Sequence, residues 1–355
     1  MMKKLLPIAG LLSRNLLKSP LLSANYLRAC SSAALKPAVV KNAPISLHIE
    51  PTTACNLRCT TCDRTHASDL NLGTMSFNVF KEILDQFNYL MGSHHVQTGL
   101  LLTGLGEPFL NKDIFRMIEY AKEKGISYVH TISNGTVLNN EAIIQSGLDH
   151  ISFSMDGATK ETFESIRVGA KYEKVVSSLK DLISRRKVGK LPFIDLNITL
   201  QGKNRNELNS VVDLAAEIGA DRVSARILNS DFAHDSLQAL GESSENIKTT
   251  SEYARAKNVE FRYADNDTDP CVYPWIWPYV TWNGYVVPCC YKSDPRKFNF
   301  GNILEESFES IWNGEKYRQF RKALTSENPP DMCKNCPKCP TKKSGSDKVE
   351  LKILD

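Results

Sequence analysis

The sequence predicts an α/β protein, in which a partial (βα)6 barrel of the TIM type precedes a small cysteine-rich domain made of a β-hairpin and a helix. Two observations lead to this fold class. Between residues 45 and 228, six short strand-like runs alternate with helical patterns, which is typical of a parallel sheet covered by helices. Nine of the ten cysteines lie in two groups, at residues 55–62 and 271–339.

The expected strands and helices of the barrel follow one another along the chain. The strands cover residues 46–50, 99–103, 128–133, 150–155, 193–200 and 222–228. The helices between them cover residues 78–91, 112–124, 140–145, 172–188 and 205–218. Because two further strands are not evident, we expect an open barrel rather than a closed eightfold one.

The C-terminal region begins with a hairpin signal. Two apolar runs, residues 277–282 and 285–290, are joined by Asn283 and Gly284, a pair that favours a tight β-turn. The hairpin places Cys289 near the end of its second strand. A short helix at 311–324 and a proline break come next, before the last three cysteines. We therefore expect four segments, which are residues 1–44, 45–264, 265–345 and 346–355.

Composition narrows the class of protein. The net charge of +4 is small and spread along the chain, which does not favour a nucleic-acid surface. No apolar run reaches the ~18–20 residues that a spanning helix needs. Ten cysteines in 355 residues are too few for a disulfide scaffold, so grouped thiols indicate metal or cluster ligands. Such thiols must stay reduced, and we expect a cytoplasmic protein.

The first 44 residues form a basic, leucine-rich segment. Seven lysines or arginines occur before the first acidic residue, Glu50, and leucines recur in pairs. Three interpretations are open: a helix that lies on a membrane surface, a targeting peptide, or a segment that packs against the catalytic domain.

The first cysteine group has the spacing C-x-x-x-C-x-x-C, at Cys55, Cys59 and Cys62, directly after a strand. A cuboidal [4Fe–4S] cluster has four irons, so three thiolates leave one iron open to a small molecule. A zinc site with three thiolates is the alternative.

The run from Glu50 to Cys62, with its Cys-Asn-Leu-Arg-Cys core, resembles the cluster motif of the radical S-adenosylmethionine (SAM) superfamily. The resemblance covers about residues 45–230. It implies that SAM chelates the open iron and is cleaved reductively to a 5′-deoxyadenosyl radical, which abstracts hydrogen from a substrate. It also implies an external electron donor of the flavodoxin or ferredoxin type. The residue before the third cysteine is often aromatic in the family, whereas here it is Thr61.

Further matches to the family follow at the ends of the next strands. The resemblance implies a loop for the SAM amino group, a ribose site, and a serine and an arginine for the SAM carboxylate. The residues concerned are Gly104, Gly106 and Glu107 for the loop, Ser133 and Asn134 for the ribose, Ser154 and Arg167 for the carboxylate, and Asn197 as a further SAM contact.

The second cysteine group resembles the SPASM domain, which holds auxiliary clusters in many radical SAM enzymes. With six cysteines rather than seven, it is similar to a shortened form with one auxiliary [4Fe–4S] cluster. The ligands expected from this resemblance are Cys271, Cys289, Cys333 and Cys336. Cys290 and Cys339 stay open as replacements, and structural zinc is the alternative to iron.

Alternation along the strands predicts a polar barrel interior. Asp195, Thr199 and Arg226 are not easily assigned to SAM, so we expect them to contact substrate. The leading hypothesis is dehydrogenation, epimerisation or rearrangement of a small polar or glycan-like molecule. The alternatives are a peptide-modifying maturase and a lipid-modifying enzyme with a peripheral membrane contact. A non-enzymatic metal scaffold leaves the matches at the strand ends unexplained.

Overall fold

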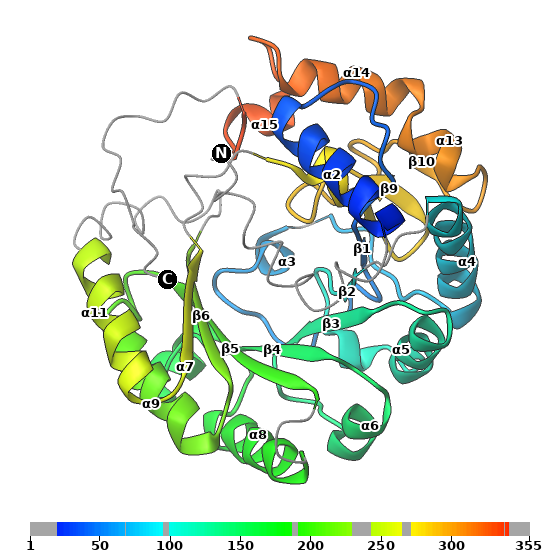
Figure 1. Cartoon of the computed structure of the whole chain (residues 1–355). Helices are drawn as coiled ribbons and strands as arrows, with labels where there is room; N and C mark the ends of the chain where they lie inside the picture. Colours follow the sequence, from blue (N-terminus) through cyan, green and yellow to red (C-terminus); the bar gives the residue numbers. More distant parts are fainter. Residues whose placement is uncertain are drawn as a thin grey trace.

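The computed structural model describes residues 20–67, 69–94, 99–186, 191–228, 243–264, 271–336 and 338–340. A curved sheet forms the centre of the molecule, and helices cover its outer face (Figure 1). Ten strands of the described residues make up this sheet, in the order β10-β9-β8-β1-β2-β3-β4-β5-β6-β7.

The barrel strands confirm the predicted parallel sheet, since each strand from β1 to β7 pairs in parallel with the next one. They are β1 (Ser46–Ile49), β2 (Gly99–Leu102), β3 (Tyr128–Ser133), β4 (His150–Ser154), β5 (Phe193–Leu200), β6 (Arg222–Ile227) and β7 (Glu260–Ala264). The last was not predicted. It extends the sheet at its edge, where alternating charged and aromatic residues replace a continuous apolar run.

Amphipathic helices pack on the outer face of the sheet, because their apolar sides can be buried only there (Figure 1). They are α4 (Phe77–His94), α5 (Ile114–Glu123), α6 (Asn140–Gln145), α7 (Lys160–Ile166), α8 (Tyr172–Arg185), α9 (Leu208–Ile218) and α11 (Ser243–Ala256). The inward-facing apolar residues of α9, such as Val211 and Val212, are fully buried.

The predicted hairpin is present and continues the barrel sheet. β8 (Tyr279–Val280) pairs in parallel with β1, and β9 (Tyr285–Val287) pairs antiparallel with β8. β10 (Gly301–Asn302) follows β9. The first strand is shorter than expected because Thr281 already begins the turn, where Gly284 adopts a φ of +87°.

Four short helices complete the C-terminal region: α12 (Tyr273–Ile276), α13 (Phe308–Trp312), α14 (Glu315–Leu324) and α15 (Asp331–Lys334). The single helix expected at 311–324 is therefore two helices. The break lies at Asn313 and Gly314, where the Asn313 side chain binds the main chain of Val40 instead of continuing the helix.

The described part of the N-terminal segment packs against the C-terminal region. α2 (Pro20–Leu35) contacts α12, and the residues after α2 cross the same surface (Figure 1). Residues 20–44 therefore pack on the folded protein, but mainly on the C-terminal region, with a smaller contact between α2 and α4 of the catalytic domain that one of the three interpretations named. Residues 1–19 lie outside the described part. No described helix is long and apolar enough to cross a membrane.

Polar residues inside the barrel pair with one another at the N-terminal ends of the strands. The Asp195 carboxylate accepts hydrogen bonds from Arg222 Nη2 at 2.8 Å and Ser224 Oγ at 2.9 Å. His150 Nε2 lies 3.6 Å from the same oxygen. His150 and Arg222 begin their strands, whereas ligands of parallel barrels bind at the opposite, C-terminal ends. The expectation that Asp195 contacts substrate is therefore corrected: it belongs to a buried ion pair.

Replacing Asp195 by alanine is expected to cost about 3–5 kcal/mol of stability, because the buried Arg222 loses its nearest acidic partner and keeps only the longer contact with the half-exposed Glu260, at 3.6 Å. Affinity for SAM should stay within about twofold of wild type, since a structural role leaves the ligand untouched. Anaerobic thermal unfolding and SAM binding measure the two quantities. Asp213→Ala, which removes an exposed pair with Lys257, is the control and should cost less than about 1 kcal/mol. Unchanged stability with lost SAM affinity would contradict the structural role.

Candidate active site

The first cysteine group lies in the loop that follows β1. Main-chain hydrogen bonds hold this loop against the end of α7, from Arg58 N to Val168 O and from Thr60 N to Ile166 O, both at 3.0 Å. Cys62 precedes the short helix α3 (Asp63–His66), and its N–H donates to Cys59 O. The loop is thereby fixed on the C-terminal side of the barrel, as the sequence predicted.

The three thiols of this loop are close enough to act on one another. Burial raises the pKa of Cys59 and of Cys62, and the neighbouring thiols of the group raise both further. Two side-chain donors approach the sulfurs: Arg167 Nη1 lies 3.9 Å from Cys59 Sγ, and Asn134 Nδ2 lies 3.8 Å from Cys55 Sγ. The group thus combines three sulfur ligands with a nearby positive charge.

The glycine-containing loop after β2 touches the main chain that leads into the cysteines. Gly106 N donates to Thr52 O at 3.1 Å, and Glu107 N donates to Ala54 O at 2.8 Å. A Cβ at Gly106 would lie 2.4 Å from Thr52 O, so only glycine fits between these two segments. Gly104 is similarly close to the Glu50 side chain.

Glu107 joins the end of β2 to the end of β3. Its carboxylate accepts from Ser133 Oγ at 2.8 Å and from Asn134 N at 2.7 Å. Burial raises the pKa of Glu107, and these donors act in the opposite direction. The structure therefore brings the expected amino-group loop and the ribose residues together, with the Glu107 carboxylate between them.

Arg167 is held by a carboxylate to which the sequence analysis gave no role. Its Nε donates to Asp156 Oδ2 at 2.6 Å, and the other oxygen of Asp156 accepts from Thr199 N at 2.7 Å. Asp156 is completely buried. The sequence signal that could have identified Asp156 was its position two residues after β4 and eleven residues before Arg167. Thr199 holds Asp156 with its main-chain N–H rather than with its side chain.

Ser154 ends β4, and its cross-strand neighbour Asn197 lies in the second half of β5. Asn197 Oδ1 also accepts from Arg226 Nε, at 3.4 Å. Both residues therefore lie at the C-terminal side of the barrel, where the sequence placed the SAM contacts.

The second cysteine group is brought together from three parts of the C-terminal region. Electrostatic effects on the thiol pKa values link Cys271 with Cys289, Cys333 and Cys336. Burial raises the pKa of Cys271 to about 11 and that of Cys333 to about 12, and the other thiols add to it. Cys339 also acts on Cys333.

Cys290 is a member of this group on which a barrel residue acts. Burial raises the pKa of Cys290, whereas a hydrogen bond with Tyr273 and the positive charge of Arg226 lower it. Arg226 on β6 therefore acts on both the C-terminal cysteines and the polar interior, where it also affects His130 of β3.

Residues 49–215 match the sequence pattern of the radical SAM superfamily, and residues 271–339 match SPASM, described as an iron–sulfur cluster-binding domain. Both matches coincide with the two cysteine groups. The chain belongs to the radical SAM superfamily.

Several relatives match most of the length of this radical SAM protein. The AdoMet-dependent heme synthase of Methanosarcina barkeri is 26% identical, over 85% of this chain and 90% of its own length. The PqqA peptide cyclase of Xanthomonas campestris pv. campestris is 25% identical, over 83% of this chain and 80% of its own. The cofactor-modifying protein of the tungsten-containing aldehyde ferredoxin oxidoreductase from Pyrococcus furiosus is also 25% identical, with 78% and 82% covered.

Solved structures share the fold. Streptococcus suis SuiB bound to SAM superposes with a TM-score of 0.63 at 15% identity, covering 89% of this chain and 73% of SuiB. Native anSMEcpe with bound AdoMet gives a TM-score of 0.64 at 19% identity, with 83% and 88% covered. The predicted partial barrel with a C-terminal SPASM domain is confirmed.

The radical SAM protein uses a [4Fe–4S] cluster and SAM, and its SPASM domain binds auxiliary iron–sulfur clusters. Both were predicted. The donor set fits these groups. Three thiols accompany a part-buried guanidinium in the first group, and thiols of the second group act on one another's pKa values. Among the described residues, no three Cys, His, Asp or Glu side chains converge on a single metal ion.

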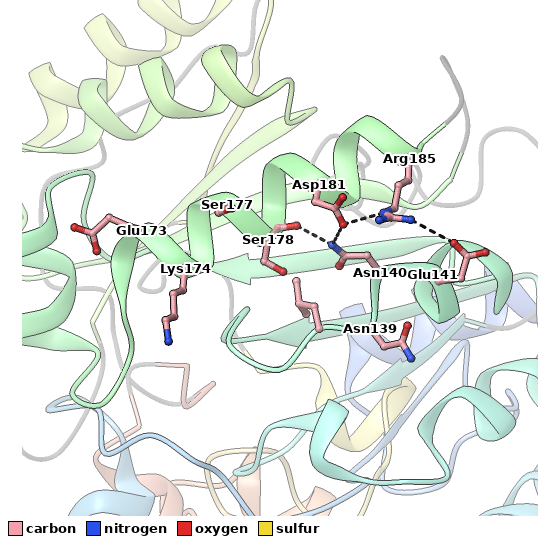
Figure 2. Close-up of a pocket in the computed structure, with 10 residues that line it drawn as sticks. Asn139, Asn140, Glu141, Glu173, Lys174, Ser177, Ser178, Asp181 and Arg185 are labelled. Carbon is pink, nitrogen blue, oxygen red and sulfur yellow. Dashed lines mark hydrogen bonds and ion pairs between the residues drawn. The ribbon is translucent and has the colours of Figure 1, made fainter.

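A surface hollow on the helical layer, between α6 and α8, is unrelated to this chemistry (Figure 2). Several of its charged and polar residues pair with one another. Asp181 accepts from Asn140 Nδ2 and from Arg185 Nε, both at 2.8 Å, and Arg185 also faces Glu141. It contains neither the cysteines nor the residues expected to bind SAM.

Glu50 connects the radical SAM barrel with the SPASM hairpin. Its Oε1 accepts from Leu105 N at 3.0 Å and from Tyr279 Oη at 3.3 Å. Burial raises the pKa of Glu50 from 4.5 to about 7, although these donors lower it. Nearby His48 has a pKa lowered to about 3 by burial, and Tyr279 has one raised well above 10, so neither changes charge near neutrality.

Stability is therefore expected to fall as pH rises through the Glu50 titration. Because the pKa of Glu50 is raised in the folded state, the stabilisation that protonated Glu50 contributes is fully present below about pH 4.5 and is lost as the pH rises past about 7. The raised pKa corresponds to about 3 kcal/mol of folding free energy. Anaerobic thermal unfolding between pH 5 and 8 should show a steeper decline for wild type than for Glu50→Gln. The exposed Glu309→Gln is the control, and parallel profiles for all three proteins would contradict the assignment.

Proposed function

We propose that this radical SAM protein abstracts hydrogen from a peptide and thereby modifies it. The catalytic cluster is held by Cys55, Cys59 and Cys62, with one iron left for SAM. When bound there, the cluster supplies the electron that cleaves SAM to the radical that removes hydrogen from the substrate. An external donor of the flavodoxin or ferredoxin type provides that electron.

The chain's own residues orient SAM. The main chain of Gly104 and Gly106 receives the amino group, while Glu107 fixes Ser133 and Asn134 for the ribose. Arg167, oriented by Asp156, receives the carboxylate together with Ser154, because a guanidinium fork suits a carboxylate. Asn197 contributes from the neighbouring strand.

Cys271, Cys289, Cys333 and Cys336 hold one auxiliary cluster. Their mutual electrostatic effects support this set. Cys290, which faces Tyr273 and Arg226, and Cys339, beside Cys333, are the residues that could replace one of the four.

The substrate is best supported as a peptide. PqqA peptide cyclases match 83% of this chain, which favours a peptide over the small polar or glycan-like substrate expected from the lumen alone. Arg226 donates to Asn197 Oδ1 and its charge acts on Cys290, and no ion pair joins it to a carboxylate of the described residues. It is placed to receive an acidic group of that peptide.

Deuterium transfer tests the substrate class. The loaded protein, SAM and dithionite are incubated anaerobically with a perdeuterated peptide digest or with a perdeuterated extract of small molecules. The proposal predicts that 5′-deoxyadenosine gains one deuterium from the peptide digest, and less so with Arg226→Gln. If deuterium is transferred only from the small-molecule extract, the peptide proposal is wrong. The substrate is then a small molecule, in line with the similarity to the heme synthase.

A further inference from the structure

The residues that follow α2 form a strap across the SPASM domain; we use this name for residues 36–42. Trp275 Nε1 donates to Pro37 O at 2.8 Å, and Trp312 Nε1 donates to Asn42 O at 3.0 Å. Asn42 Nδ2 returns a hydrogen bond to Trp275 O, also at 3.0 Å. The strap lies outside both matched regions, which begin at residues 49 and 271.

A buried arginine fastens the middle of the strap. Arg321 of α14 is fully buried, and its Nη1 donates to Ala38 O at 3.3 Å while its Nε donates to Pro274 O at 2.7 Å. Its guanidinium also lies over the Trp312 ring. The strap is thus held by the SPASM domain along its whole length rather than resting on its surface.

Lys36 begins the strap in an unusual backbone conformation. Its φ is +53°, in the left-handed region, and its N–H closes α2 on Ser32 O at 2.9 Å. Glycine is the usual residue at this position after a helix, because it adopts a positive φ without steric cost. A lysine in this conformation is uncommon, so the contacts of its side chain are of interest.

That side chain reaches the second cysteine group. Lys36 Nζ donates to the carbonyl oxygen of Cys271 at 2.9 Å and lies 5.2 Å from the centre of the Trp275 ring. The charge of Lys36 acts on the Cys271 thiol, and the ammonium is half-buried, where solvent screens it less than at the surface. Lys41, on the same strap, is exposed.

We propose that the strap completes the auxiliary centre and that Lys36 raises the reduction potential of the cluster held in part by Cys271. The inference rests on the proposed ligand role of Cys271. Reduction adds one electron from the donor to the cluster and its thiolates, so their negative charge increases by one. A fixed cation nearby stabilises the reduced form more than the oxidised form.

The experiment is a redox titration with dithionite, followed by electron paramagnetic resonance. The full chain carries Cys55/Cys59/Cys62→Ala, so that the auxiliary cluster alone contributes the signal. Lys36→Met is expected to lower the midpoint potential relative to this parent. Lys36→Arg, which keeps the charge, and Lys41→Met, which removes an exposed one, should leave it near the parent value.

Iron content is measured first in every variant. If Lys36→Met retains its iron and keeps the parent potential, the role of Lys36 is overturned. A potential shift as large in Lys36→Arg as in Lys36→Met would also overturn it, because charge would then not be the cause. Should Lys36→Met lose iron, Lys36→Asn, which tolerates the left-handed conformation, replaces it in the same comparison. A parent without any iron would instead overturn the auxiliary site itself.

Discussion

The Arg167→Met variant is expected to lose about 3–5 kcal/mol of stability and at least tenfold in SAM affinity. The stability loss follows because Asp156, which is completely buried, loses the guanidinium partner that lies 2.6 Å away. The affinity loss follows because a hydrogen bond to a charged group contributes about 1.5–3 kcal/mol. Anaerobic thermal unfolding and SAM binding to the loaded protein measure the two effects.

A second substitution separates the two roles of Arg167. In Arg167→Met/Asp156→Asn the unpaired charge is removed, so stability should recover in part while SAM affinity stays low. Arg167→Lys retains charge but not the fork, and should show intermediate SAM affinity. Recovery of SAM binding in the double variant would show that Arg167 acts only by neutralising Asp156.

The Gly106→Ala variant is expected to displace the loop that we propose as the receptor of the SAM amino group. The new Cβ would lie 2.4 Å from Thr52 O and 2.5 Å from Ala54 O, both main-chain atoms that cannot rotate away. Overpacking of this kind costs about 1–3 kcal/mol. Because the same contact positions the chain before Cys55, release of 5′-deoxyadenosine should fall at least tenfold.

Gly202→Ala is the matched control. A Cβ at Gly202 meets no atom within 4 Å, so this variant should resemble wild type in stability and in SAM cleavage. Equal activity of the two alanine variants would mean that the loop tolerates the displacement and does not position SAM.

The strands β1–β6 and the first cysteine group could be predicted because their signals are local. Buried parallel strands are short apolar runs, and Cys55, Cys59 and Cys62 lie within eight residues of each other in sequence. The strand β7 was missed because an edge strand buries little and its sequence alternates with charged residues.

Contacts between distant parts of the chain could not be predicted in the same way. Alternation showed that Asp195 faces the interior, but not that it lies near the N-terminal ends of the strands, where Arg222 neutralises it. Likewise, nothing in the spacing of Lys36 and Cys271, 235 residues apart, indicates their hydrogen bond. Such pairings depend on how the sheet curves and on how the SPASM domain joins it.

The central claim is that two cysteine groups hold two separate clusters and that the first cleaves SAM. The most direct test counts iron per chain in the anaerobically reconstituted protein and in Cys55/Cys59/Cys62→Ala, and measures 5′-deoxyadenosine release with dithionite. We predict about eight irons for wild type and about four for the variant, with release abolished in the variant. Release that persists in the variant, or iron that does not decrease, would contradict the account.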